Sequence, residues 1–317
     1  MSKFPPLDLS RIRCTHLAGR ESKVSLAHLG RPHTPGGSLR SFLENLPNTL
    51  AAADLRELAR RWAEAAAGGK TIILAMGAHP IKVGLSPVII DLMECGALSA
   101  LAMNGAGIIH DAELALAGHT SEDVAAMLAA GDFGMAEETQ RFLNAATRRA
   151  AADGIGLGQA VGEALKDAPN ARLSLLAQAA RLGIPATVHV AIGTDTIHLH
   201  PEASGAAIGE ASLNDFRTFC AAVATLEGGV HVNLGSAVIL PEVFLKALTL
   251  ARNLGHHASD FTTANLDFNA HYRPLTNVVR RPTLEGGRGF NLLGHHEIMF
   301  PLLAAAVKES LQAGKGS

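Results

Sequence analysis

One short stretch, "LAMNGAGIIHDAEL", combines residue types that can bind a ligand and move a proton. Its apolar run ends at Asn104, glycines follow at Gly105 and Gly107, and His110 and Asp111 come where a helical pattern begins. Glycines let the backbone approach a ligand closely, and the first turn of a helix offers unpaired N–H groups to an anion. Histidine and aspartate can exchange protons with a substrate. The stretch predicts a binding turn followed by two candidate catalytic residues, although tight packing alone would also explain the glycines.

Similar residues follow four other apolar runs, in the segments "MGAHP", "IGTD", "LGSA" and "TTANLD". The carboxyl ends of parallel strands share one edge of a sheet, and ligands of such sheets bind beyond that edge. These side chains are therefore expected to gather around one ligand, and the recurrence favours a slot for a long, charged coenzyme. The pattern places at this edge Gly77, His79, Asn104, Asp195, Gly235, Ser236 and Asp267.

Short apolar runs alternate with longer helical patterns along most of the chain. This alternation is typical of βαβ units and predicts an α/β fold with a doubly wound, mostly parallel sheet. Residues 1–47 contain several prolines and no sustained periodicity, so we expect an irregular arm laid over the surface, and one domain from 48 to 317. Strands are expected at residues 70–76, 97–103, 185–192, 229–235 and 260–266.

The composition excludes several classes of protein. The 317 residues have a formal net charge of −2, which gives no general attraction to nucleic acid or anionic lipid. The three cysteines are far apart and suggest no disulfide framework. No apolar run reaches the length of a membrane span, and the opening residues lack the pattern of a signal peptide. We expect a cytoplasmic protein that acts on a small molecule, with neither nucleic acid nor membrane as a partner.

Five segments, in order, resemble the deoxyhypusine synthase family: "GAHPIKVG", "NGAGIIHDAEL", "IGTDTIHLH", "VNLGSAVILPEVFLKALTLARNLGHHASDFTTANLDFN" and "GHHEIMFPLLAAAV". The resemblance implies that family's Rossmann-like, NAD-binding fold, NAD or a related dinucleotide as cofactor, and a homo-oligomer, usually a tetramer. It also implies that the dinucleotide cleft is lined by Gly77, His79, Asn104, Gly105, Ala106, Gly107, Thr262, Thr263, Ala264 and Asp267, with His110, Asp111, Asp195 and His295 facing it.

The chain departs from the family where the family's chemistry takes place. The family forms an imine on a lysine shortly before its final "FPLL" segment, but no lysine occurs here between Lys246 and Lys308. Arginines stand in the matching region, and arginine cannot be deprotonated to attack a carbon atom. Pro241 and Glu242 stand where the family has a histidine pair. We expect hydride transfer on a small amine or hydroxy substrate, followed by transfer or elimination, without a lysine imine.

On this hypothesis Asp195 and Asp111 hold a cationic substrate, while His110 or His296 moves the proton. His295, His296 and Glu297 stand near the start of the last helical pattern. A histidine beside a carboxylate can form an acid–base pair there, or these residues are only the polar start of a helix.

An arginine cluster follows in a glycine-rich stretch. Guanidinium groups suit carboxylates and phosphates, so the cluster is a candidate site for an anionic part of the substrate or for the cofactor diphosphate, or else a solvated face or subunit contact. Its candidate members are Arg280, Arg281 and Arg288.

Two alternative functions remain open. His198 and His200 alternate, so on a strand they would share a face and would suit a metal-assisted hydrolase or lyase. The chain has no HExxH motif and no cysteine ligand set, so a metal is not expected. The other alternative is a nucleotide-binding protein without catalytic activity.

Overall fold

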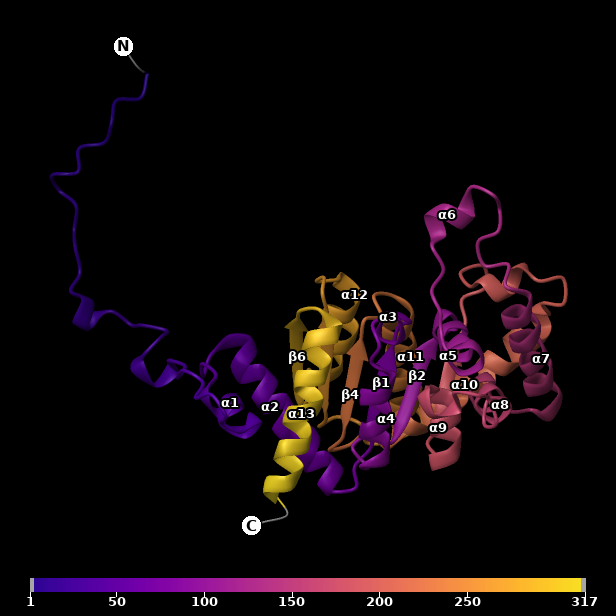
Figure 1. The fold of residues 1–317 in the computed structure, drawn as a ribbon. Helices are drawn as coiled ribbons and strands as arrows, with labels where there is room; N and C mark the ends of the chain where they lie inside the picture. Colours follow the sequence, from indigo (N-terminus) through magenta and orange to yellow (C-terminus); the bar gives the residue numbers. More distant parts are fainter. Residues whose placement is uncertain (1–2, 315–317) are drawn as a thin grey trace.

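The structure is a computed structural model that describes residues 3–314, and a six-stranded parallel sheet lies at its centre (Figure 1). The strand order is β3-β2-β1-β4-β5-β6, and every neighbouring pair is parallel. The order reverses between β1 and β4, which is where open α/β sheets form a ligand crevice. The strands are β1 Ile72–Met76, β2 Ala100–Asn104, β3 Ala186–His189, β4 Val230–Leu234, β5 Thr262–Asp267 and β6 Arg288–Leu293.

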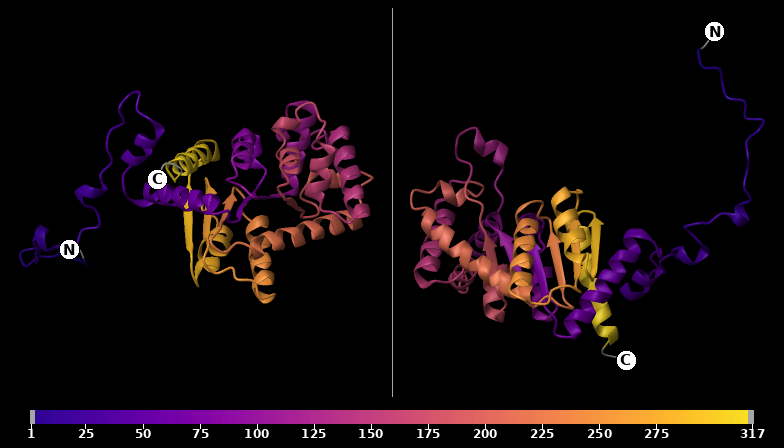
Figure 2. Two further views of the ribbon diagram at one scale, coloured as in Figure 1. Left: turned by 90° about the horizontal axis from the view of Figure 1, so that it is seen from below. Right: turned by 180° about the vertical axis from the view of Figure 1, so that it is seen from behind.

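Helices cover both faces of the sheet (Figure 2), so the predicted doubly wound α/β architecture is confirmed. Successive strand residues point to opposite faces, and Leu74 packs in one core whereas Ile73 packs in the other. One face is covered by α2 Leu50–Ala67, α4 Ser86–Glu94, α5 Gly105–Ala117, α9 Leu175–Leu182 and α13 His296–Gly314, and the other by α10 Gly205–Ala224 and α11 Ile239–Asn253.

Further helical elements complete the fold around the sheet and its two helical layers. The helices α7 and α8 pack beside α10 near the β3 edge of the sheet. No helix among residues 3–314 is both long enough and apolar enough to cross a lipid bilayer. These elements are α1 Leu39–Asn45, α3 His79–Lys82, α6 Val124–Leu128, α7 Glu137–Asp153, α8 Leu157–Ala164, α12 Tyr272–Pro274 and a π-helical segment Leu275–Arg280.

The N-terminal segment does not follow the sequence-based expectation. Residues 3–38, which we call the arm, lead away from the folded body in Figure 1 instead of lying over its surface. Nearly every arm residue is exposed. Backbone hydrogen bonds to the body begin only at His28, whose carbonyl accepts from Asn48, and at Arg31, which donates to Asn45.

The last strand, β6, was not expected, because its sequence is rich in arginine and glycine. Asn291 lies in register with Asn265 of β5 and Asn233 of β4. Their side chains form a buried ladder, with Nδ2···Oδ1 distances of 2.8 Å between Asn233 and Asn265 and 2.9 Å between Asn265 and Asn291. An isolated polar asparagine argues against a core strand in sequence, whereas in the sheet the three asparagines pair with one another, although Oδ1 of Asn233 has no partner within residues 3–314.

Two glycines determine how closely the chain passes where β1 and β4 end. A Cβ atom on Gly77 would lie 2.5 Å from the carbonyl oxygen of Gly235. Gly77 donates a hydrogen bond to Leu234, and Gly235 donates one to Leu266, so backbone pairing continues past both strands. Gly235 also has φ of +66°, a conformation that favours glycine. The crossing leaves no room for a side chain.

We expect Gly77→Ala to lower the free energy of unfolding by about 1–3 kcal/mol, as overpacking does, because the backbone at Gly235 must move. The matched control is Gly209→Ala in α10, where the added Cβ meets nothing within 4 Å. A helix-interior glycine replaced in open space should raise stability by about 0.5–1 kcal/mol. Urea unfolding of both variants measures the difference, and equal effects would contradict the close approach.

Candidate functional site

Two histidines from distant parts of the chain meet where β1 and β4 end. His79 begins α3, directly after the Gly77 turn, and His296 begins α13. Their Nδ1 atoms lie 2.9 Å apart, so one ring donates a hydrogen bond and the other accepts it. A Cβ atom on Gly235 would lie 2.5 Å from Cε1 of His296, so the missing side chain makes room for this ring.

The second nitrogen of His296 has no hydrogen-bond partner within residues 3–314. This Nε2 atom is buried and lies 4.0 Å from Oδ1 of Asp267, the last residue of β5. Burial lowers the pKa of His296, and the Asp267 carboxylate opposes that shift while His79 adds to it. The predominant form at neutral pH is therefore the neutral imidazole, a polar group that a ligand can still engage.

An aromatic surface covers the histidine pair on its outer side. Phe268 follows β5 and is 45% exposed. Its ring centroid lies 5.4 Å from that of His79 and 5.5 Å from that of His296, and it stacks on His295 at 6.3 Å with an interplanar angle of 10°. Such an exposed set of rings suits a planar heterocycle, which can stack on it. We call His79, Asp267, Phe268, His295 and His296 the ring cluster.

A separate pocket of about 170 Å³ opens beyond β2 and β3. One wall is the first turns of α5 and another is the loop that contains Asp195. The outer wall is residues 118–138, which include α6 and which we call the flap. The polar or charged residues that line the pocket are Lys82, His110, Glu113, Ser121, Glu122, Thr139, Thr194, Asp195 and Thr196.

A chain of hydrogen bonds fixes the proton position on His110. The hydroxyl of Thr120 donates to Glu113 Oε2 at 2.5 Å, and His110 Nδ1 lies 2.7 Å from the same hydroxyl oxygen. Since the hydroxyl has one proton and gives it to the carboxylate, Nδ1–H of His110 must donate to Thr120. Nε2 of neutral His110 is then the proton acceptor. Burial, and to a smaller extent Lys82, lowers the pKa of His110, while Glu113 opposes the shift.

Asp195 places a carboxylate at the inner end of the pocket. The residue is 7% exposed, and its Oδ2 atom lacks a hydrogen-bond partner in the described chain. The carboxylate occupies the space in front of Gly105, where any Cβ atom would collide with it. Burial raises the pKa of Asp195, and His198 and Thr194 counteract part of that rise. A buried acceptor without a partner is a favourable site for a cationic group.

Asp111 does not face this pocket, which corrects the expectation that it helps to hold the substrate. It is fully buried and accepts hydrogen bonds from the Ser174 hydroxyl at 2.6 Å and from the backbone of Leu175 and Leu176 at 2.7 and 3.2 Å. Burial raises its pKa to about 6 despite these bonds. The carboxylate caps the start of α9, which is a structural role.

Several expected cofactor residues lie within or beside the sheet. Strand β5 begins at Thr262 and ends at Asp267, so Thr262, Thr263 and Ala264 are inside a strand, not at its carboxyl end. The Ser236 hydroxyl accepts from the backbone of Leu240 and supports the start of α11. Asn104 likewise caps α5, because its side chain accepts from Gly107. The structure therefore places only part of the expected cofactor-binding residues at the carboxyl edge of the sheet.

The expected arginine cluster is also dispersed. Arg288 begins β6 and therefore lies at the amino edge of the sheet, where it stacks over Phe290. Arg281 donates to the Asn277 side chain at 2.9 Å, and Arg280 ends the π-helical segment. Guanidinium groups at the amino edge cannot reach a ligand at the carboxyl edge, so we exclude Arg288 from the site.

The histidines proposed as metal ligands do not lie on a strand. His198 belongs to a 3₁₀ turn, Thr196–Leu199, and its Nδ1 accepts from the Gly193 backbone at 3.1 Å. His200 Nδ1 accepts from the Glu202 backbone. Within residues 3–314, no three His, Cys, Asp or Glu side chains gather as metal ligands. Glu297 is on the exposed side of α13, with Oε1 3.8 Å from Nδ1 of His295.

Sequence reasoning missed Lys82, Glu113, Thr139 and Phe268. A signal existed for Glu113, which follows His110 by three residues and so shares its face of the helix. Lys82, Thr139 and Phe268 come from α3, α7 and the loop after β5, and only the tertiary fold brings them to the carboxyl edge of the sheet.

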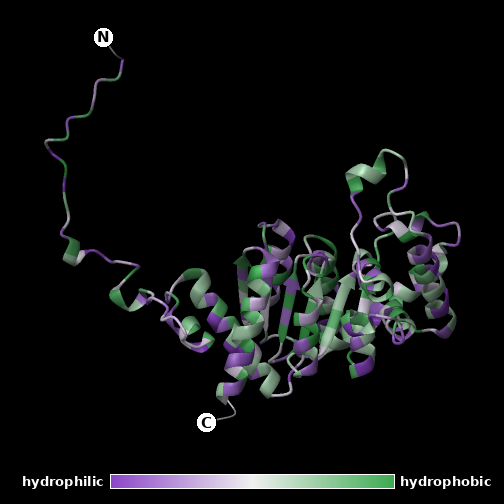
Figure 3. Ribbon diagram, viewed as in Figure 1, coloured by the Kyte–Doolittle hydropathy of each residue, from purple (hydrophilic) through white to green (hydrophobic). Residues whose placement is uncertain are grey.

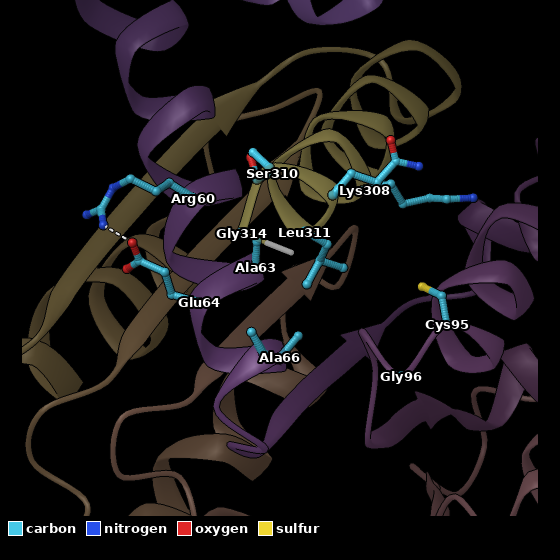
Figure 4. A pocket seen from close by; sticks show the side chains of 13 residues that line it. Arg60, Ala63, Glu64, Ala66, Cys95, Gly96, Lys308, Ser310, Leu311 and Gly314 are labelled. Atoms are coloured by element: carbon cyan, nitrogen blue, oxygen red, sulfur yellow. Dashed lines mark hydrogen bonds and ion pairs between the residues drawn. The ribbon is translucent and has the colours of Figure 1, made fainter. Parts of the chain in front are cut away.

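A larger cavity, about 740 Å³, lies at the opposite edge of the sheet between α2 and the end of α13 (Figure 4). Its charged residues are paired: Arg60 lies 2.5 Å from Glu64, and Lys308 lies 2.7 Å from Asp91. Paired surface charges leave little for a ligand to bind. This cavity is not the candidate functional site.

No protein-family model and no curated protein sequence matches this chain. Solved structures do match. A conserved LOR/SDH protein from Methanococcus maripaludis S2 aligns with a TM-score of 0.52 and 16% identity over 82% of this chain and 70% of that one. A protein named as a deoxyhypusine synthase from Entamoeba histolytica aligns with a TM-score of 0.51 and 14% identity over 87% and 95%.

The cyanobacterial arginine dihydrolase ArgZ has a TM-score of 0.52 and 14% identity to this chain, covering 83% of this chain but only 34% of its own. At these identities the likeness establishes the fold and not the activity. The fold expected from the resemblance to deoxyhypusine synthase is confirmed.

Proposed function

We propose that this protein is an enzyme that binds a nicotinamide dinucleotide at the ring cluster and transfers hydride to or from a small amine or hydroxy substrate in the His110 pocket. The observation that carries the proposal is the position of two complementary sites on one edge of the sheet. One site offers aromatic surface and histidines, and the other offers a carboxylate and an oriented base.

The ring cluster has the chemistry that a nucleotide needs. Phe268 and His295 offer stacked, exposed rings to a planar base. Nε2 of His296 is a buried polar atom that still lacks a partner in the described chain, and the Gly77–Gly235 crossing keeps side chains out of the crevice. The bound nicotinamide would supply the hydride acceptor. We place the cofactor here, and not at the start of α5, because the Asp195 carboxylate already occupies the space in front of Gly105.

The neighbouring pocket has the chemistry that an amine or alcohol needs. Asp195 attracts an ammonium group, and Nε2 of His110 accepts a proton from the substrate nitrogen or hydroxyl as hydride leaves the adjacent carbon. Glu113 and Thr120 hold the His110 tautomer. Three carboxylates and one lysine line the pocket, and this excess of acidic over basic groups favours a cation over an anion.

The helix α3 joins the two sites. His79, at its first residue, belongs to the ring cluster, and Lys82, at its last, lines the His110 pocket. Three residues of α-helix rise about 4.5 Å. A cofactor and a substrate bound at either end of α3 would be close enough for direct transfer.

A lysine imine at the family's position has no support. Lys308, the first lysine after Lys246, pairs with Asp91 and lines the cavity at the opposite edge. After oxidation, part of the substrate would instead be transferred to a small acceptor molecule or lost by elimination. The alternative of a nucleotide-binding protein without activity leaves the oriented His110 unexplained.

We expect NAD to bind, and Phe268→Ala to weaken its affinity about 5- to 100-fold, since a base stacked on an aromatic ring contributes about 1–3 kcal/mol. The matched control is Tyr272→Ala, which removes another exposed ring nearby, outside the ring cluster. Calorimetry with NAD and with NADP measures both variants. Flat traces with both nucleotides, or equal losses in the two variants, would contradict this cofactor site.

We expect His110→Ala to reduce turnover at least about 100-fold, the usual contribution of a positioned base. NAD affinity should change little because His110 lies outside the ring cluster. Turnover is followed by the absorbance of reduced nicotinamide with a panel of small amines and alcohols. Unchanged turnover would remove His110 from the mechanism, and turnover with none of the panel would contradict the proposed substrate class.

We expect KM for an amine substrate to fall as pH rises, because only the ionised Asp195 attracts ammonium. Burial raises the pKa of Asp195, so this change should occur above the ordinary aspartate value of about 3.9. In Asp195→Asn, KM should be higher and this pH dependence absent. The same pH dependence in the variant would show that another group holds the amine.

A further inference from the structure

The arm carries apolar surface that the folded body does not cover. Leu7 and Leu26 are each 87% exposed. Its hydrogen bonds before His28 are local, as from Ile12 to Leu9 and from Gly19 to His16. Leaving so many large apolar side chains in water is unfavourable, and such surfaces mark interaction sites. The exposed apolar side chains between residues 5 and 29 are Leu7, Leu9, Ile12, Leu17, Val24, Leu26 and Leu29.

The charge of the arm is opposite to that of the body. Residues 3–38 contain six lysines and arginines and two acidic residues, a formal net charge of +4. The remaining residues contain 21 lysines and arginines and 27 acidic residues, a net charge of −6. The arm is therefore both apolar and basic, and a surface complementary to it is apolar and acidic.

The flap is such a surface. Residues 118–138 contain five acidic residues and no lysine or arginine. Of these acids, Glu137 pairs with Arg141 and Asp123 caps α6, while Asp132 and Glu138 are exposed. The exposed apolar residues between them are Val124, Met127, Leu128 and Met135. Figure 3 colours the ribbon of α6 toward the hydrophobic end of its scale.

The arm and the flap of one chain lie at opposite ends of the sheet. The flap adjoins the β2–β3 end, whereas the arm leaves the body beside α1 and α13, near β6, and points away (Figure 1). Six strands separate these ends by about 24 Å. The 25 residues before His28 can span about 80 Å when extended, so their length allows either flap, and it is the direction of the arm, away from its own flap in Figure 1, that favours the flap of a neighbouring molecule.

We propose that the arm of one copy of this chain docks on the flap of a second copy. Leucine and isoleucine side chains of the arm pack on the apolar residues of the flap, and arginines of the arm pair with its carboxylates. Reciprocal docking closes a symmetric dimer, since each copy has one arm and one flap. The proposal does not rest on the cofactor or the substrate, because Met127, Leu128 and Met135 of the flap lie outside the lining of the His110 pocket, to which Val124 alone of the four apolar residues belongs.

A cross-linking experiment tests which surfaces meet. Cys14 is an exposed thiol within the arm. In a full-length Cys95→Ser background, Met127→Cys adds one thiol to the flap, and a short bismaleimide is expected to give a covalent dimer. The matched control Lys166→Cys places a thiol on an exposed site outside the flap and should give none. Adding Cys14→Ser should abolish the dimer.

Charge reversal tests whether the opposite charges of the arm and the flap drive their association. Arg11→Glu with Arg13→Glu is expected to weaken self-association about tenfold, and Asp132→Lys with Glu138→Lys should do the same. In a mixed dimer of the two double variants both arm–flap pairs are complementary again, the reversed arm with the reversed flap and the native arm with the native flap, so mixing should restore dimers, as measured by sedimentation. Three results would each overturn the proposal: cross-links within one chain, equal cross-linking of Lys166→Cys, or a monomer whose arm binds anionic vesicles instead.

Discussion

The close passage of the backbone at Gly77 and Gly235 is the constraint on which the rest of the site depends. It lies between β1 and β4, where the strand order reverses and the helices that follow leave for opposite faces. The space that a Gly235 side chain would fill is taken by the His296 ring, which in turn meets His79. Backbone geometry at two glycines thus decides where two imidazoles from distant segments come together.

The same edge of the sheet presents two chemical environments. The ring cluster is aromatic and contains a histidine whose pKa is lowered by burial. The pocket beyond β2 and β3 is lined by three carboxylates and one lysine and contains an oriented imidazole. A cofactor with a flat ring and a cationic substrate therefore have separate, adjacent places. Likeness to solved structures at 14% identity establishes the fold of this chain and does not specify a reaction.

Buried polar residues divide into two groups according to whether their hydrogen bonds are complete. Asp111 accepts three hydrogen bonds, and Asp215 accepts from the backbone of Gly158 and Val188, so both stabilise the fold. In contrast, Asp195 Oδ2 and His296 Nε2 lack partners within residues 3–314. A buried polar atom without a partner costs free energy, and a bound ligand would offset that cost.

The sequence by itself determined the alternation of strands and helices, and with it a parallel sheet whose carboxyl ends share one edge. It also placed His79, His110, Asp195 and Asp267 near that edge, because each directly follows or ends an apolar run. Only the tertiary structure decided which side chains face a ligand. Asp111 is one residue beyond His110, but consecutive helical residues point about 100° apart, so one faces the pocket and the other the core. Strand β6, Phe268 and the direction of the arm depend on contacts between distant segments, which local sequence patterns do not encode.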